Sequence, residues 1–585
     1  MNRYFPLCFA LLACGGDGGG IIQPDPNAHD ITSLAPGEYR VLTPSDIPDG
    51  INLSSVTENR EFLIVVGNSS TSGDVEANYL VRGNFAPTSS VKAVQQLEMS
   101  PQVVAEMAAL ERMERPQRSL EKRVRGFERK ALSFGGISAP RAGSSPSLRP
   151  SAQVAAVPNV GDTIDLKVPL VDGPTNNLCQ DFVRTRAVVA AVSDRAILAV
   201  DTLDGPPAGL FTQTDFNAIS TEFDNVTYPT DEAFFGTPTD IDANQRVIIL
   251  FTGEVNKLTP PGTPEGSGFV GGFFFAGDFF PPTGTPGQSC AQSNQAEIFY
   301  LLAPDPTGLK YGNPRTVTSL RQGTRGTIAH ELQHMINSGR RYTGGIAEDF
   351  ESSWLDEALA HMGEEVVGRR VKNFTDFQSL SYQDVFPNEA GRNDFNAFFF
   401  QNLARFRYWM QRPDTSSGIS DEAGTNLATR GAGWALLRYS TDNFSNGDAR
   451  AFLRRLVAGP DTGITNFNLA TGVPLDTVVA GWLVSNFADD LPNFTITNPR
   501  TQYRSFNMRS VMSGINGQNG PYPLQTAAVG SGNASLAGTN RTGSGTYYTL
   551  TVAANSGARN VKVLNQAGTA LASFPGAHIY VLRTR

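Results

Sequence analysis

The sequence predicts an α+β protein of several domains, and three observations support this prediction. The chain has 585 residues, which is too long for one hydrophobic core. Hydrophobic residues make up 40% and charged residues 18%, a balance that excludes a wholly disordered or coiled-coil chain. The 58 glycines and 37 prolines are typical of many turns and short strands, between which longer helical patterns occur.

The N-terminus has the pattern of an export signal. A basic start is followed by nine apolar residues, from Phe5 to Ala13, too few to cross a bilayer as a helix. The run ends in Leu-Leu-Ala-Cys at Cys14, which resembles the lipobox of bacterial lipoproteins. The resemblance implies a signal peptide at 1–13, a lipid on Cys14, a tether at 14–33, and an extracytoplasmic place on the bacterial cell envelope, on the periplasmic side or the cell surface. An ordinary signal peptide or a buried strand is the alternative.

This interpretation leaves two cysteines in the mature chain. Cys8 leaves with the signal and Cys14 carries the lipid, so Cys179 and Cys290 remain. Two thiols in an oxidising compartment are most simply paired, and we therefore predict a disulfide between them. Two separate buried thiols are the alternative.

The rest of the chain divides by composition. Short strand patterns predict an N-terminal β domain at 34–92 and a small C-terminal β-sandwich at 520–585. Residues 93–152 form a charged helix and a Pro- and Ser-rich linker, either a pro-segment or a solvated helix with a spacer. Residues 153–315 predict a β-rich subdomain, and residues 316–495 predict a helical one.

The helical part contains the sequence His330-Glu331-Leu332-Gln333-His334, an H-E-x-x-H motif. Residues four apart lie on the same face of a helix, so both imidazoles can bind one metal ion. Glu331 then lies beside the ion, where it can take a proton from a metal-activated water. A structural or vestigial zinc site is the alternative.

A third protein ligand is needed. Metzincin-type enzymes place Gly and His after the motif, but this chain has Asn337 and Arg340 there, so that type is excluded. A ligand from the next predicted helix, at 352–366, remains. Periodicity does not choose among its polar residues, which are Asp356, Glu357, His361, Glu364 and Glu365.

Residues 354–360 (WLDEALA) resemble the W-L-N/D-E-G-x-A segment of gluzincin metallopeptidases. Together with HELQHM at 330–335 and RGAGW at 430–434, they most resemble the hyicolysin-type metallopeptidases, over roughly residues 155 to 490. The resemblance implies a zincin-like domain and one Zn²⁺ held by His330, His334 and Glu357. It also implies that Glu364 supports an imidazole from outside the ligand set.

Three positions depart from the pattern of related enzymes. The 22 residues between His334 and Glu357 are a few more than in the thermolysin and aminopeptidase branches. Position 358 is Ala instead of the common Gly. Related enzymes often supply a Tyr that stabilises the oxyanion, and here Arg430 or Tyr439 is the hypothesis, with surface or packing roles as the alternative.

These observations together predict a zinc-dependent endopeptidase that hydrolyses protein or peptide substrates outside the cytoplasm. An extended substrate is expected to add to the strand near 297–302 through main-chain hydrogen bonds. The alternative is a lipid-anchored surface binding protein with an inert zinc site. The net charge of −9 argues against a nucleic-acid partner, and a monomer attached to the membrane only through Cys14 is expected.

Overall fold

The computed structural model describes most of the chain. The described residues are 30–54, 56–71, 75–83, parts of 105–118, 119–128, 156–203, 211–263, 269–284, 289–344, 347, 349–420, 427–495, 497–517, 520–530 and 535–585. The predicted signal peptide at 1–13, Cys14 and most of 93–152 lie outside them. The mixed α+β prediction is confirmed.

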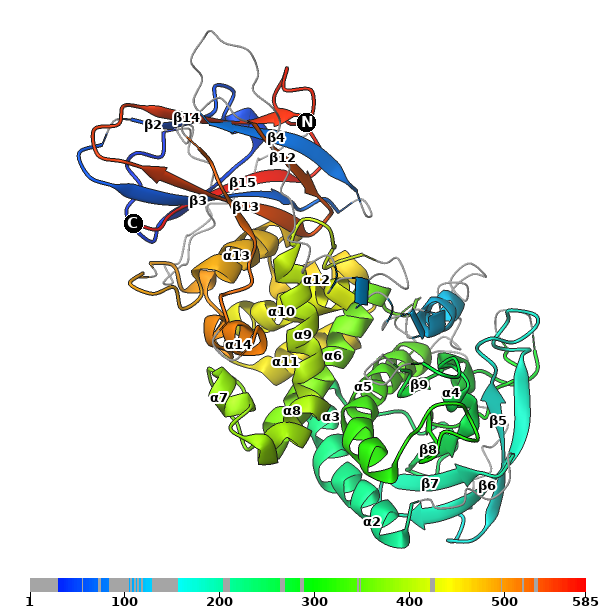
Figure 1. Cartoon of the computed structure of the whole chain (residues 1–585). Helices are drawn as coiled ribbons and strands as arrows, with labels where there is room; N and C mark the ends of the chain where they lie inside the picture. The colour runs from blue at the N-terminus through cyan, green and yellow to red at the C-terminus, as the bar shows by residue number, and fades with distance from the viewer. Residues whose placement is uncertain are drawn as a thin grey trace, which may run out of the picture.

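The first and last strands of the chain together form one β-sandwich (Figure 1). One sheet has the order β1-β15-β3-β13-β11 and the other β12-β4-β14-β2. Their bounds are β1 Tyr39–Leu42, β2 Ile51–Leu53, β3 Arg60–Asn68, β4 Ala77–Gly83, β11 Thr526–Ala528, β12 Ser535–Asn540, β13 Ser544–Val552, β14 Arg559–Asn565 and β15 Ala577–Arg583. The regions 34–92 and 520–585, predicted as two domains, are therefore two parts of one sandwich, because Val65 of β3 pairs with both Tyr547 and Tyr580.

A second sheet has the strand order β5-β6-β7-β8-β10-β9. Its strands are β5 Thr163–Pro169, β6 Phe182–Val192, β7 Ala196–Asp201, β8 Val247–Thr252, β9 Gly272–Phe274 and β10 Ile298–Leu302. β7, β8 and β10 run parallel. β8 is buried throughout and apolar from Val247 to Phe251, as expected for a strand covered on both faces. β9 lies at the edge of the sheet and runs antiparallel to β10.

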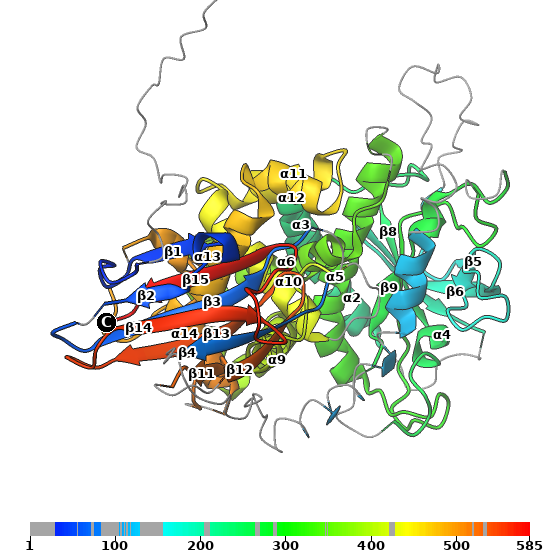
Figure 2. The same cartoon turned by 90° about the horizontal axis from the view of Figure 1, so that it is seen from above.

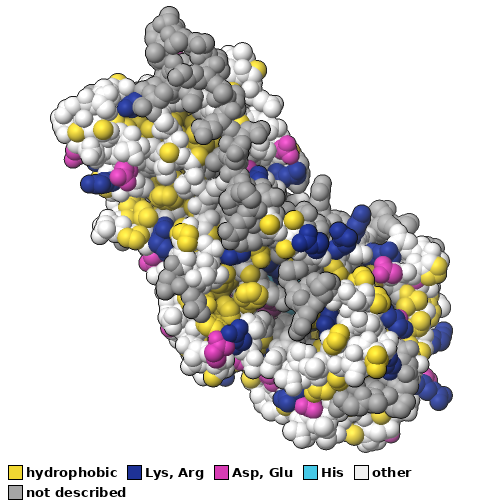
Figure 3. Space-filling model, viewed as in Figure 1, with side chains coloured by type: hydrophobic (Ala, Val, Ile, Leu, Met, Phe, Trp, Pro, Cys, Tyr) yellow, Lys and Arg dark blue, Asp and Glu magenta, His cyan; other side chains and the backbone are white. Residues whose placement is uncertain are grey.

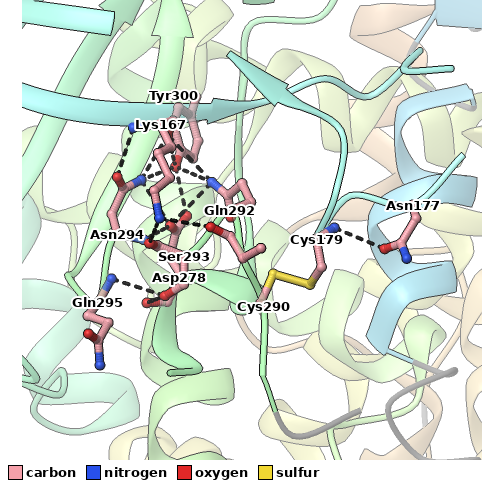
Figure 4. The surroundings of a disulfide bond; sticks show 11 residues. Lys167, Asn177, Cys179, Asp278, Cys290, Gln292, Ser293, Asn294, Gln295 and Tyr300 are labelled. Atoms are coloured by element: carbon pink, nitrogen blue, oxygen red, sulfur yellow. Dashed lines mark hydrogen bonds between the residues drawn. A yellow bond between two sulfur atoms is a disulfide. The ribbon is translucent and has the colours of Figure 1, made fainter. Parts of the chain in front are cut away.

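Short helices connect the strands of this sheet. They are α2 Gln213–Glu222, the π-helical turn η3 Phe223–Thr227, α3 Tyr228–Phe235, α4 Gly253–Asn256 and the 3₁₀ turn η4 Ala276–Phe279. The loop from η4 to β10 is joined to the loop between β5 and β6 by a disulfide between Cys179 and Cys290, so that prediction is confirmed. Figure 4 shows the bond beside Asp278, whose carboxylate accepts hydrogen bonds from the Tyr300 hydroxyl at 2.7 Å and from the backbone N–H of Asn294 at 2.8 Å.

A group of helices follows the sheet along the chain. They are α5 Val317–Gly344, α6 Ser353–Val371, α7 Tyr382–Val385, α8 Arg392–Phe398, α9 Phe400–Gln411, α10 Leu427–Phe444, α11 Ala449–Ala458, α12 Gly463–Thr471, α13 Leu475–Ala488 and α14 Met508–Ile515. α5 packs against α6 and against the edge strand β9, and the sheet and the helices share one hydrophobic core. The sandwich rests on α13, where the Tyr547 hydroxyl donates to the Leu483 carbonyl at 3.0 Å.

Membrane-spanning character is weak in the described part of the chain. No single helix there is long and apolar enough to cross a membrane. α12 and α13, bent by 77° relative to each other, reach that length and composition only as a pair.

Candidate metal centre

The H-E-x-x-H motif lies in the middle of the long helix α5. The Nε2 atoms of His330 and His334 face each other at 3.1 Å, and both imidazoles are buried. On the opposite face of the helix, Leu332, Met335 and Ile336 are fully buried in the core. The amphipathic pattern of this helix therefore separates a polar face, which holds the imidazoles, from the face that anchors the helix.

Glu357 comes from the second turn of α6 and lies against both imidazoles. Its Oε2 is 3.5 Å from His330 Nε2, and its Oε1 is 3.9 Å from His334 Nε2. One ligand atom from each of the three residues falls within 4.8 Å of the others. Ligands about 2.0–2.1 Å from a tetrahedral zinc ion are about 3.3 Å apart, so these three side chains fit a zinc ion and leave a fourth position for water.

Carboxylates behind the imidazoles orient them. Asp356 Oδ2 is 2.8 Å from His334 Nδ1, and Asn337 donates to the other oxygen of Asp356. Glu364 Oε1 is 2.7 Å from His330 Nδ1. With Nδ1 of each ring directed at a carboxylate, Nε2 is the nitrogen left for a metal.

Glu364 is shared by a third histidine, so the network extends away from the metal ligands. Its Oε1 is also 2.9 Å from His361 Nδ1, and Arg405 Nη1 lies 3.0 Å from His361 Nε2. Burial lowers the pKa of His361 to about 3. His361 is therefore neutral, donating to Glu364 through Nδ1 and accepting from Arg405 through Nε2.

Burial and close charges shift the pKa values of two of the three candidate ligands. Burial opposes protonation of His330, but its contacts with Glu357 and Glu364 outweigh burial and raise its pKa to about 10. Burial acts against ionisation of Glu357 as well, yet Arg430 and the two imidazoles hold its pKa well below the ordinary value. The centre thus keeps a charged carboxylate in a buried position, as a cation site requires.

Glu331 lies between α5 and the edge of the sheet. Its Oε2 accepts a hydrogen bond from the backbone N–H of Phe274 in β9 at 2.8 Å. The strand near 297–302, predicted to receive the substrate, is β10, which is paired with β8 on one side and β9 on the other. That prediction is wrong, because β10 has no free edge, and the edge that reaches the centre belongs to β9.

The two hypothetical oxyanion donors lie in different places. Arg430 Nη2 is 3.0 Å from Glu357 Oε2 and also forms an ion pair with Glu121. The Tyr439 hydroxyl donates instead to the Arg500 carbonyl at 2.7 Å. Nine residues along a helix make about two and a half turns, so Arg430 and Tyr439 lie on opposite sides of α10. The structure therefore gives no support to Tyr439 as an oxyanion donor.

Sequence reasoning missed several residues around the centre. Asp356 was among the polar residues that periodicity could not tell apart, and only the fold shows that it supports His334 and leaves Glu357 to face both imidazoles. No sequence motif indicated that Arg405 would contact His361, or that the backbone of Phe274 in the edge strand would contact Glu331. The helix at 119–128 also reaches the centre, since Arg125 lies 3.3 Å from Glu357 Oε1.

The comparisons with known proteins agree with this geometry. No family model matches the chain. It is 30% identical over 266 residues to the neutral metalloprotease ShpI of Staphylococcus hyicus. The chain is similar to a metalloprotease. The match covers 44% of this chain and 56% of ShpI, so the chain spans about half the length of the curated relative it matches.

Proposed function

We propose that this chain is a hyicolysin-type zinc metalloendopeptidase that hydrolyses protein substrates outside the cytoplasm. The observation that carries the proposal is the convergence of His330, His334 and Glu357 within 4.8 Å. Glu331 lies beside them, on the same helix as the two histidines. The similarity to ShpI supports the same assignment. The disulfide supports an oxidising compartment. A lipid anchor at Cys14 stays a prediction, since that residue lies outside the described part of the chain.

Each residue of the centre has a role in the proposed hydrolysis. His330, His334 and Glu357 hold the zinc ion. When bound, zinc supplies an acidified water and a Lewis acid for the scissile carbonyl. Glu331 takes the proton of the attacking water and passes it to the leaving amine. Arg430, beside Glu357, is the remaining candidate for stabilising the oxyanion.

The edge strand β9 gives the substrate a place to bind. One edge of β9 is paired with β10, so an extended peptide would approach the opposite edge, where the Phe274 N–H donates to Glu331. Main-chain pairing of this kind accepts many sequences, which favours an endopeptidase acting on unfolded or extended segments of proteins.

The substitution Glu331→Gln tests the proposal. Glutamine keeps an oxygen that can accept from Phe274 but cannot take a proton, so we expect one zinc ion per chain and a loss of about 10²–10⁴-fold in casein hydrolysis. Metal content by atomic emission and cleavage with and without a chelator are the measurements. His334→Ala is the comparison and is expected to lose the metal as well. Full hydrolysis by the Glu331→Gln protein would reject the mechanism.

A further inference from the structure

The helix at 119–128 packs onto the candidate metal centre. In Figure 2 it is the light-blue helix beside β9 and α5. Its buried residues recur three or four apart, so one face of the helix is covered; they are Leu120, Glu121, Val124, Arg125 and Glu128. Lys122, on the other side, is exposed, and Lys and Arg side chains gather on the surface in this region (Figure 3). The solvated helix considered from the sequence therefore does not describe residues 119–128.

Arg125 brings a positive charge to the carboxylates of the centre. Its Nη1 lies 3.0 Å from Asp356 Oδ2, and its Nε lies 3.3 Å from Glu357 Oε1. The guanidinium is also held from its own helix by Glu128, at 2.9 Å. A buried cation therefore contacts the carboxylate that would bind the metal and the carboxylate that orients His334.

The second oxygen of Glu357 is engaged through the same helix. Glu121 forms an ion pair with Arg430, and Arg430 lies 3.0 Å from Glu357 Oε2. Each oxygen of Glu357 thus faces a guanidinium group. Glu121 fastens the helix to α10 on one side of the centre, while Arg125 fastens it to α6.

The apolar side of the helix packs next to the edge strand. The Phe127 ring lies 4.8 Å from the ring of Phe275, the residue that follows β9, and 6.0 Å from the ring of Phe280. Leu120 and Val124 belong to the same core as these rings. The helix therefore lies at the place where a substrate paired with β9 would have to pass.

We infer that the 119–128 helix is an intramolecular inhibitor of this centre, acting through Arg125. Its guanidinium competes with a metal ion for Glu357, and the body of the helix blocks access to β9. This inference rests on the proposed function, and it names a regulation of the same site. A pro-segment was one of the two alternatives considered for 93–152, and this contact is the one through which it would act.

The sandwich limits how the inhibition can be relieved. β1 to β4 precede the helix in sequence, and β3 lies between β13 and β15. Loss of everything before residue 153 would remove these strands from both sheets of the sandwich. Relief therefore requires displacement of the helix, or cuts on both sides of 119–128, with the N-terminal strands kept in place.

The test compares Arg125→Met with Lys122→Met in the full chain. Methionine keeps much of the volume of the Arg125 side chain and removes its charge. Lys122, on the exposed side of the same helix, is the matched control. We expect Arg125→Met to raise the zinc affinity of the metal-free protein at least tenfold, measured against a chromophoric chelator, and to raise casein hydrolysis at least tenfold. Lys122→Met should change neither. Melting temperatures establish that both variants are folded, and Arg125→Gln replaces Arg125→Met if the latter is not.

The outcomes separate this inference from the proposed function. Unchanged zinc affinity and unchanged, chelator-sensitive hydrolysis in a folded Arg125 variant would overturn the inference and leave the peptidase standing. A tenfold gain in zinc affinity with no hydrolysis by any form would support the competition at Glu357 and reject the peptidase.

Discussion

Removal of the disulfide should destabilise the domain that carries the candidate centre by a predictable amount. The perturbation is Cys179→Ala combined with Cys290→Ala, which leaves no single thiol behind. The two cysteines are 111 positions apart, and closing a loop of that size lowers the entropy of the unfolded chain by about 16 cal/mol/K, or about 4.8 kcal/mol at 25 °C. The hydrogen bond from the backbone N–H of Gln292 to the Cys179 carbonyl uses only backbone atoms, so it survives the substitution.

Urea unfolding without reductant measures this difference. Trp354 and Trp434 belong to the same hydrophobic core as both cysteines, so tryptophan fluorescence reports on the relevant transition. We expect the free energy of unfolding to fall by about 3–5 kcal/mol. The parent protein in reductant should approach the variant, and the variant should not respond to reductant. A difference below about 1 kcal/mol would refute the reasoning from loop closure.

Two further predictions concern buried charges. Burial raises the pKa of Asp278 to about 7 from an ordinary 3.8, so the folded state holds this proton more tightly than the unfolded state. The free energy of unfolding should therefore fall on the order of 4 kcal/mol as the pH rises from about 4 to above 7. Urea titrations across this range should show the decline in the parent and a flatter profile in Asp278→Asn, and equal slopes would contradict the assignment. A buried ion pair joins Arg341 of α5 to Glu351, which lies just before α6, and so links the two helices of the centre. Arg341→Met should lower the free energy of unfolding by about 3–5 kcal/mol, because the Glu351 charge stays buried without its guanidinium partner. Thermal melts should show partial recovery when Glu351→Gln is added, because glutamine removes the buried charge and keeps an acceptor for the Gly463 N–H. Equal stability of parent and Arg341→Met would show that the pair contributes nothing.

Local signals in the sequence predicted the parts of the fold that depend on one segment. The H-E-x-x-H helix, the continuous apolar strand β8 and the pairing of Cys179 with Cys290 each needed only residue type and spacing. The assignment of Glu357 came from a resemblance, because helical periodicity alone could not separate it from Asp356. Which carboxylate reaches the imidazoles depends on how α6 crosses α5, and that crossing is a property of packing.

Features that join distant segments could not be predicted in this way. Each half of the sandwich has the strand pattern of a small β domain. Nothing in either half shows that Val65 of β3 pairs with Tyr547 and Tyr580, which follow it by 482 and 515 positions. The burial of the 119–128 helix could not be predicted for a related reason. Charged residues such as Glu121 and Arg125 favour a solvated surface in the sequence, and they are buried here only because Glu357 and Arg430 arrive from other helices.

Strands from the two ends of the chain alternate in the sandwich, and this sets the order in which its sheets can form during synthesis. β1 to β4 are synthesised first, but β3 and β1 find their partner β15 only when residues 577–583 have been made. Until then the backbone N–H and C=O groups on these edges stay unpaired, which exposes them to wrong pairing with other chains. Contacts this distant in sequence also form slowly. A chain that stops before β15 would therefore leave β1 without the strand that it pairs with and β3 with one edge unpaired.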